Sequence, residues 1–153
     1  MKKVAREITV AALAAGTTLG AVGIAQSHSS GKLSSSVFSW GECTEKKTIV
    51  GSQRPFFDTP TATLENLEVH ATTIKGGEAS HAPHRHPDEE LVIVREGTLE
   101  VIINGKVQKA GPGSVIFFGS NDLHGMRNAG DTPVTYHVIR WISAATPKAE
   151  EKK

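Results

Sequence analysis

Short segments in which apolar and polar residues nearly alternate fill the middle of the chain, and turn-forming residues separate them. The first clear one is 64–74, which ends at Gly76-Gly77. Later segments are rich in β-branched residues and lie at 90–95, 99–103, 106–108, 115–118 and 134–142. Alternation over short segments predicts β-strands, and no segment after residue 26 has a convincing helical period. The pattern therefore predicts an all-β fold, built as a sandwich or a barrel.

Two details of this pattern add to the prediction. Asn104-Gly105, between two of the segments, is typical of a type I′ turn and predicts a hairpin. The segments 91–94 and 101–103 are apolar at every position, so both faces of these strands are apolar. One face meets the interior, and the other needs cover from another sheet or another subunit. We therefore expect a homodimer.

The beginning of the chain departs from the strand pattern. Three basic residues within the first six precede the stretch 8–25, which carries no charge and consists mostly of small and aliphatic residues. Small residues at 23–25 are what a signal peptidase reads, and cleavage there would make Gln26 the new N-terminus. The stretch predicts a signal peptide over residues 1–25 and export to the periplasm or the extracellular space. An uncleaved membrane anchor is the alternative.

One domain accounts for the rest of the chain. Residues 26–36 are rich in serine and predict a flexible leader, and 147–153 form a charged tail, which leaves 37–146 as the folded domain. The whole chain has 153 residues and a formal net charge of +1. This length fits a single domain with a core. The near-neutral charge gives no reason to expect nucleic acid as a partner, and we expect no stable membrane insertion once the signal is removed.

Cys43 is the only cysteine of the chain, so the domain has no internal disulfide. The residue is expected either as a small buried apolar side chain or as a bridge between two chains. Stability then comes from the core, from oligomerisation or from a bound metal ion.

The residues that carry chemistry are three histidines and a glutamate. His84 and His86 are two apart, and residues two apart on a strand point to the same side. After a turn, Glu90 opens the next strand at an even offset that keeps it compatible with the same face, and His124 comes from a separate segment. Imidazoles with one carboxylate suit a divalent transition metal. We therefore predict a site for one ion, which is Fe, Mn, Ni, Cu or Zn.

Three other histidines of the predicted domain stand outside this group. His81 lies in the segment that leads to it, near the expected mouth of the site. It is either a solvated loop histidine or an acid–base group that contacts substrate, and it is the one candidate for catalysis. His70 and His137 lie on predicted strands and are expected as ordinary core or surface histidines. Met126 shares the parity of His124 and is expected to line the pocket.

The spacing of the four residues resembles the cupin superfamily, and more closely its small single-domain, cupin-2-type members. The first cupin motif has a glycine, a His-x-His pair, a glutamate after three or four residues, and a glycine after six more. Here Gly77 precedes His84 and His86, Glu90 follows after three residues, and Gly97 follows after six. Only the leading glycine is displaced, by one residue.

The second cupin motif is present with two changes. Gly113 is followed by His124 and Asn128 at the spacing of the family. Between them, Gly119 and Asn121 stand where the family has proline and glycine, and residues of all these types form turns. The turn of the motif is therefore expected to survive the changes.

The resemblance covers roughly residues 64–142. It implies a single conserved-type β-barrel, which is a double-stranded β-helix or jelly roll. Independently of the resemblance, neutral imidazoles and one carboxylate would leave a bound divalent ion with residual positive charge, which would attract a small molecule that is anionic or rich in oxygen. The metal ligands that the resemblance implies are the four residues of the site, His84, His86, Glu90 and His124.

A metal site with open positions implies an enzyme, and a dioxygenase, an isomerase and a lyase are among the reactions that such a metal supports. Some cupin lyases place a tyrosine two residues after the metal glutamate. This chain has Val92 there, which counts against that group. The alternative is a non-catalytic module that binds a small molecule or uses the metal for stability. The residues leave the substrate and the metal open.

Overall fold

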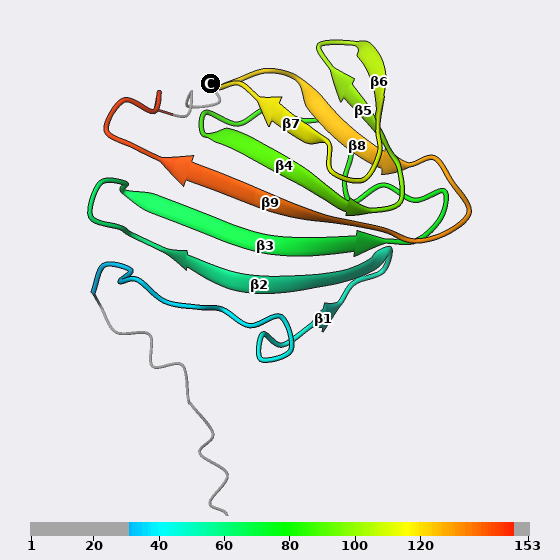
Figure 1. Cartoon of the computed structure of the whole chain (residues 1–153). Coiled ribbons are helices and arrows are strands. Elements are labelled where there is room, and N and C mark those ends of the chain that lie inside the picture. Colours follow the sequence, from blue (N-terminus) through cyan, green and yellow to red (C-terminus); the bar gives the residue numbers. More distant parts are fainter. Residues whose placement is uncertain (1–30, 149–153) are drawn as a thin grey trace, which may run out of the picture. The chain divides into compact units, whose positions relative to one another are not determined.

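The computed structural model describes residues 31–148, and the regular structure in that part is entirely β-strand (Figure 1). The predicted signal peptide, residues 26–30 of the predicted leader and residues 149–153 of the predicted tail lie outside the described residues. Within 31–148, no helix is long and apolar enough to cross a membrane. The strands are β1 (Lys46–Lys47), β2 (Gly51–Thr59), β3 (Asn66–Ile74), β4 (Glu89–Glu96), β5 (Leu99–Ile103), β6 (Lys106–Ala110), β7 (Val115–Phe118), β8 (His124–Asn128) and β9 (Val134–Ile142).

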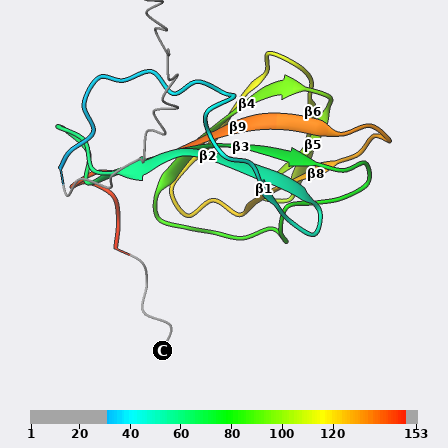
Figure 2. The same cartoon turned by 90° about the horizontal axis from the view of Figure 1, so that it is seen from below.

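These strands form two antiparallel sheets. The larger sheet has the order β1-β2-β3-β9-β4-β7, and the smaller one has the order β6-β5-β8. Figures 1 and 2 show the smaller sheet toward one end of the larger one. The neighbours β4 and β5 belong to different sheets, and Gly97, with a φ of 78°, makes the turn between them. This is a jelly-roll arrangement, and the predicted all-β barrel class is confirmed.

The predicted strands agree closely with the observed ones. The predicted ranges of β5, β7 and β9 are exact, and those of β3, β4 and β6 differ by at most two residues at either end. The hairpin between β5 and β6 turns at Asn104 and Gly105, whose φ angles of 47° and 83° suit a type I′ turn. The strands β1, β2 and β8 were not predicted from the sequence. Pro55 and a register shift next to it interrupt the pattern of β2, and β8 contains a glycine and no β-branched residue.

The hydrophobic core lies between the inner faces of the two sheets. Its members come from both sheets, and the largest are fully or almost fully buried. Burial of each such side chain stabilises the fold by about 1.5–3 kcal/mol. The core consists of Ile74, Val92, Val94, Leu99, Val101, Ala110, Ile116, Phe118, Met126, Val134, Tyr136 and Val138. On β3 and at the end of β9, polar residues replace apolar ones at inner positions, and this is where the core gives way to a pocket.

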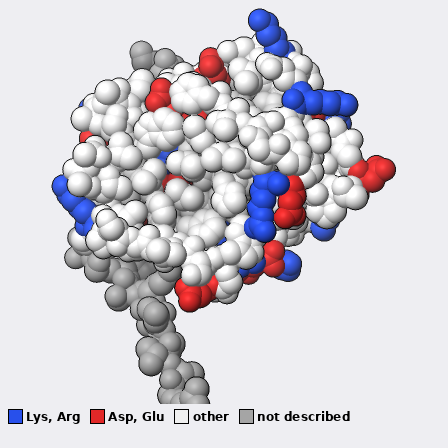
Figure 3. All heavy atoms as spheres, in the orientation of Figure 1, with Lys and Arg blue, Asp and Glu red and all other residues white. Residues whose placement is uncertain are grey.

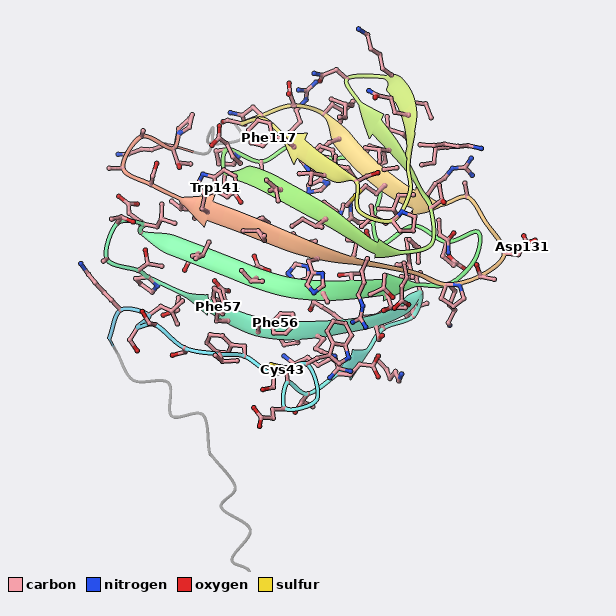
Figure 4. All side chains as sticks on the ribbon, viewed as in Figure 1. Cys43, Phe56, Phe57, Phe117, Asp131 and Trp141 are labelled. Carbon is pink, nitrogen blue, oxygen red and sulfur yellow. The ribbon has the colours of Figure 1, made fainter. Side chains whose placement is uncertain are left out.

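A segment that precedes β1 covers part of the outer face of the larger sheet. The Trp40 ring lies 6.1 Å from that of Phe56 and 5.9 Å from that of His137. Figure 4 shows Cys43 and Phe56 together on this side of the sheet. Cys43 is free and buried, as expected of a small apolar side chain. His137 belongs to this outer cluster, on the face of β9 opposite Tyr136.

The outer face over β4 and β7 is bare in the described part of the chain. Ile93, Val115 and Phe117 are 36%, 62% and 52% exposed, and the Phe117 ring stacks on Trp141 at 6.4 Å (Figure 4). Figure 3 shows that the face seen there carries few charged side chains at its centre, with most of them toward its edge. The apolar outer face that the sequence predicted is therefore present.

Candidate metal centre

Three histidine side chains meet inside the barrel. His84, His86 and His124 each place a ring nitrogen within 4.8 Å of those of the other two. The backbones of His84 and His124 exchange two hydrogen bonds of 2.9 and 3.0 Å, which draws the segment before β4 onto the start of β8. The prediction that His84 and His86 lie on one strand was wrong. The structure has a single isolated bridge at His84 and then an irregular extended segment. The two side chains nevertheless converge, as their spacing of two residues predicted.

Hydrogen bonds to the backbone set the tautomers of two of the rings. His86 Nδ1 lies 2.8 Å from the carbonyl oxygen of Asp88, and His124 Nδ1 lies 2.8 Å from that of Asp122. A carbonyl oxygen only accepts, so each Nδ1 carries the hydrogen and each Nε2 keeps a lone pair. Backbone bonds of this kind are the usual support of metal-binding histidines.

One ring nitrogen of each of the three histidines lacks a hydrogen-bond partner in the described part of the chain. Within residues 31–148, the Nε2 atoms of His86 and His124 and the Nδ1 atom of His84 are buried without a hydrogen bond. Buried polar atoms nearly always have a partner, and exceptions call for an explanation. A metal ion held between the rings explains these unpaired nitrogens, so the donor set fits such a group.

The pKa values of the rings suit ligands rather than cations. Burial, followed by the neighbouring histidines, lowers the pKa of His84, and burial lowers the pKa of His124. Both are therefore neutral near pH 7, in the form that binds metals. For His86, the Glu90 carboxylate that lies 3.5 Å from Nε2 instead raises the pKa.

Glu90 lies next to this group, as its spacing predicted. It is the second residue of β4, it is 7% exposed, and its Oε2 is 3.5 Å from Nε2 of His86. Two ligand atoms that share an ion at about 2.1 Å lie roughly 3.0 to 4.2 Å apart, depending on the angle between them. The contact between Glu90 and His86 falls in that range. The structure thus brings the three histidines together and places Glu90 against one of them, His86, while the binding of an ion by these four residues stays a prediction.

A charged group that the sequence analysis missed lies directly beside Glu90. Arg140 on β9 is paired in register with Glu90 on β4 and with Glu68 on β3. Its Nε and Nη2 atoms each lie 2.7 Å from Oδ2 of Asp88, and its Nη1 lies 3.4 Å from Oε2 of Glu68. Only the strand register brings these residues together, and the sequence contains no local signal for it.

A pocket of about 340 Å³ opens beside the histidines. This volume is at the small end of the range for ligand sites. Its lining is mixed and mostly polar, and Met126 belongs to it, as the parity predicted. The lining residues are Thr48, Val50, Ser52, Gln53, Glu68, His70, Thr72, Ser80, His81, His84, Glu90, Met126, Tyr136, Val138 and Arg140.

The other histidines take different places relative to this pocket. His81 is exposed and lines it, with its ring 4.3 Å from that of His84. His70 is buried and lines it as well, with Nδ1 2.9 Å from Oε1 of Glu68. This contact lowers the pKa of Glu68, which stays ionised. His137 lies in the outer aromatic cluster.

Comparison with known families agrees with the fold and the motifs. Residues 70–140 match the family model of the cupin domain, Cupin_2. The chain belongs to the cupin superfamily, with a domain of the cupin-2 type. A search of curated proteins found no match.

Solved structures with the same fold are numerous. An RmlC-like cupin from Shewanella frigidimarina NCIMB 400 has a TM-score of 0.57 and 20% identity, over 72% of this chain and 95% of that one. The polyketide cyclase RemF from Streptomyces resistomycificus has a TM-score of 0.59 and 16% identity, over 79% and 89% of the two chains. A Cupin 2 conserved barrel domain protein from Salinispora arenicola CNS-205 has a TM-score of 0.58 and 18% identity, over 74% and 93%. At these identities the likeness shows the fold alone.

Proposed function

We propose that this chain is a metal-dependent cupin enzyme that acts on a small, oxygen-rich molecule. Its proposed ligands for one divalent transition ion are the three converging histidines, His84, His86 and His124, and Glu90, which lies beside His86. The observation that carries the proposal is the set of three buried imidazole nitrogens without partners, one of which belongs to His84 at the wall of a pocket. Perturbed titratable groups in a concave site of this kind are a usual mark of function.

When bound, the ion would supply Lewis acidity or, if it is redox-active, a place where substrate and dioxygen meet. The protein's own groups bind and orient the substrate around that position. Burial raises the pKa of the Tyr136 phenol, so it stays protonated and can donate a hydrogen bond to a ligand oxygen. His81 at the mouth is the candidate for carrying a proton, and a plain solvated histidine is its alternative role.

The charges around the pocket bear on the kind of substrate. Glu68, Asp88 and Glu90 face Arg140, so three carboxylates oppose one guanidinium. A divalent ion would bring this group close to neutrality, and little positive charge would remain to hold a strong anion. Among the anionic and oxygen-rich ligands expected from the sequence, the structure therefore favours weakly charged, oxygen-rich ones.

Elemental analysis of the purified chain tests the metal site. We expect about one transition-metal ion per chain after expression in a medium that contains Fe, Mn, Ni, Cu and Zn, because three imidazoles converge and the Glu90 carboxylate lies beside one of them. Protein that is folded by circular dichroism but metal-free after this treatment, and that binds none of these ions on dialysis, would contradict the proposal.

Oxygen uptake separates a dioxygenase from the other reactions of such a site. A dioxygenase is expected to consume oxygen with at least one compound in a panel of flavonols, diketones and thiols when it is loaded with Fe, Mn, Ni or Cu. No uptake with any metal would leave isomerase or lyase chemistry, for which the metal acts as a Lewis acid. A non-catalytic module that is stabilised by its metal is the second candidate, because the histidines join the segment before β4 to β8.

We also propose that the bare outer face over β4 and β7 pairs two copies of the chain. The exposed side chains of Ile93, Val115 and Phe117 give this face an apolar centre of the kind that subunit interfaces cover. Size-exclusion chromatography with light scattering at micromolar concentration should give the mass of a dimer. A monomer mass under these conditions would exclude the pairing.

Export through a cleaved signal peptide over residues 1–25 is a further part of the proposal. The support is the basic start and the uncharged stretch that follows it in the sequence. Protein recovered from the periplasm or the medium of a bacterial host should begin at Gln26. Recovery of the uncleaved chain in the membrane fraction would favour the anchor instead.

A further inference from the structure

The contacts of Arg140 divide unequally among the three carboxylates around it. Nε and Nη2 both lie 2.7 Å from one oxygen of Asp88, whereas Nε is 3.9 Å from Oε2 of Glu90. A separation of 3.9 Å is too long for a hydrogen bond. The guanidinium therefore holds Asp88 firmly, attracts Glu90 only by charge, and leaves the oxygens of Glu90 free for another partner.

Asp88 also contacts His86, so it links the position of Arg140 to the orientation of the His86 ring. While Oδ2 is held by Arg140, Oδ1 lies 3.3 Å from Nδ1 of His86, and the backbone carbonyl oxygen of Asp88 accepts a hydrogen bond from the same Nδ1 at 2.8 Å. Asp88 is 5% exposed, so its carboxylate has little room to turn toward water. Arg140, Asp88 and His86 thus form a continuous chain of contacts that ends at Nδ1 of the His86 ring, while the other ring nitrogen, Nε2, has no hydrogen-bond partner.

We propose that Arg140 is a positioning residue of the metal centre. Through Asp88 it fixes the orientation of the His86 ring, and through its charge it keeps Glu90 beside that ring, without being a ligand itself. This inference rests on the metal site proposed above. Groups that orient metal ligands in this manner typically change metal affinity by 10–100-fold when they are removed.

A purely repulsive role is the opposing possibility, because a guanidinium close to a metal site also repels the incoming cation. The geometry decides between the two effects. The Arg140 charge is already paired with Asp88 at 2.7 Å and is shared with Glu68 at 3.4 Å, so little of it is left to act on an ion. The loss of orientation should therefore exceed the gain from reduced repulsion.

Cobalt binding to the purified chain tests the proposal. Co²⁺ alone is the probe, its dissociation constant is measured by titration, and its visible absorption spectrum reports the ligand geometry. We expect R140Q to bind Co²⁺ about 10–100-fold more weakly and to have an altered spectrum. R140K should also bind Co²⁺ more weakly, because a lysine keeps the charge but lacks the planar guanidinium whose two nitrogens contact Asp88. The matched control is R127Q, which removes a comparable ion pair, that of Arg127 with Glu100 at 2.6 Å, from the other sheet.

The outcomes separate this proposal from the metal site itself. If the unmodified chain binds no Co²⁺, the proposed site fails and this inference fails with it. If the unmodified chain binds Co²⁺ and R140Q has the same affinity and spectrum, or binds more tightly, the positioning role is overturned while the site stands. If R140Q does not fold, D88N decides in the same way, since it removes the carboxylate that Arg140 holds and keeps the backbone bond to His86. In the R140Q/D88N double variant, affinity should fall no further than in the weaker single variant, because both changes break one chain of contacts.

Discussion

Replacing His124 by alanine is expected to abolish the stabilisation of this protein by a divalent metal ion. A bound ion stabilises the folded chain by about 2.7 kcal/mol at a concentration of 100 times its dissociation constant. For a domain of this size that corresponds to a rise in melting temperature of roughly 10 °C. His124 is 1% exposed and presents a free Nε2 to the other two histidines, so alanine removes one of the three converging ring nitrogens. The melting temperature should be measured for each variant with and without Zn²⁺.

The increment between the two measurements matters more than either value alone. The His124 ring also stacks on Phe118 at 4.2 Å, and alanine leaves a cavity there, so the metal-free variant will melt earlier for a separate reason. His137→Ala is the matched control, because it removes an imidazole from the outer aromatic cluster. The control should keep the full rise with Zn²⁺. A rise of equal size in the two variants would show that His124 does not hold the ion.

The fold was predictable because its pattern is local. Short segments rich in β-branched residues between turn-forming residues predicted the exact bounds of β5, β7 and β9, and Asn104-Gly105 predicted the hairpin. Two of the strands that were not predicted lack this local pattern. The β2 strand contains Pro55 and a bulge, and β8 is mostly polar with a glycine, so tertiary pairing and not intrinsic preference makes both of them strands.

The candidate site likewise has a part that the sequence predicted and a part that it did not. Spacing within one short segment was enough to bring His84, His86 and Glu90 together, and the second motif tied His124 to them. Arg140 was missed because its place opposite Glu90 depends on the register between β4 and β9, which are far apart in the sequence.

His70 is another residue whose place in the site could not be predicted from the sequence. It was expected as an ordinary core or surface histidine, and it is indeed buried, but its strand faces the pocket and its neighbour there is Glu68. Parity alone could not tell which face of β3 points inward. A polar residue at an inner position is therefore easily read as part of the core when it belongs to the wall of a pocket.

Gly97→Ala is expected to destabilise the fold by about 2–5 kcal/mol. The turn between β4 and β5 has a φ of 78° at Gly97, and a side chain in this left-handed region costs about 1–2 kcal/mol. A Cβ atom there would also lie 2.9 Å from Cα of Val134 and 3.0 Å from the carbonyl oxygen of Pro133. Relief of that crowding requires a backbone shift that costs about 1–3 kcal/mol more. Urea denaturation measures the sum.

Gly113→Ala separates the two contributions, because Gly113 has a φ of 81° and open space where its Cβ would be. In Gly113→Ala the free energy of unfolding should fall only by the cost of the backbone conformation, about 1–2 kcal/mol. Equal losses in the two variants would mean that the contact with Val134 contributes nothing. The close approach at Gly97 lies where β4 leaves the larger sheet, at the opposite end of that strand from Glu90. The folded fraction of Gly97→Ala should therefore bind Co²⁺ with unchanged affinity, because the register that places Glu90 against Arg140 is set at the other end of the strand.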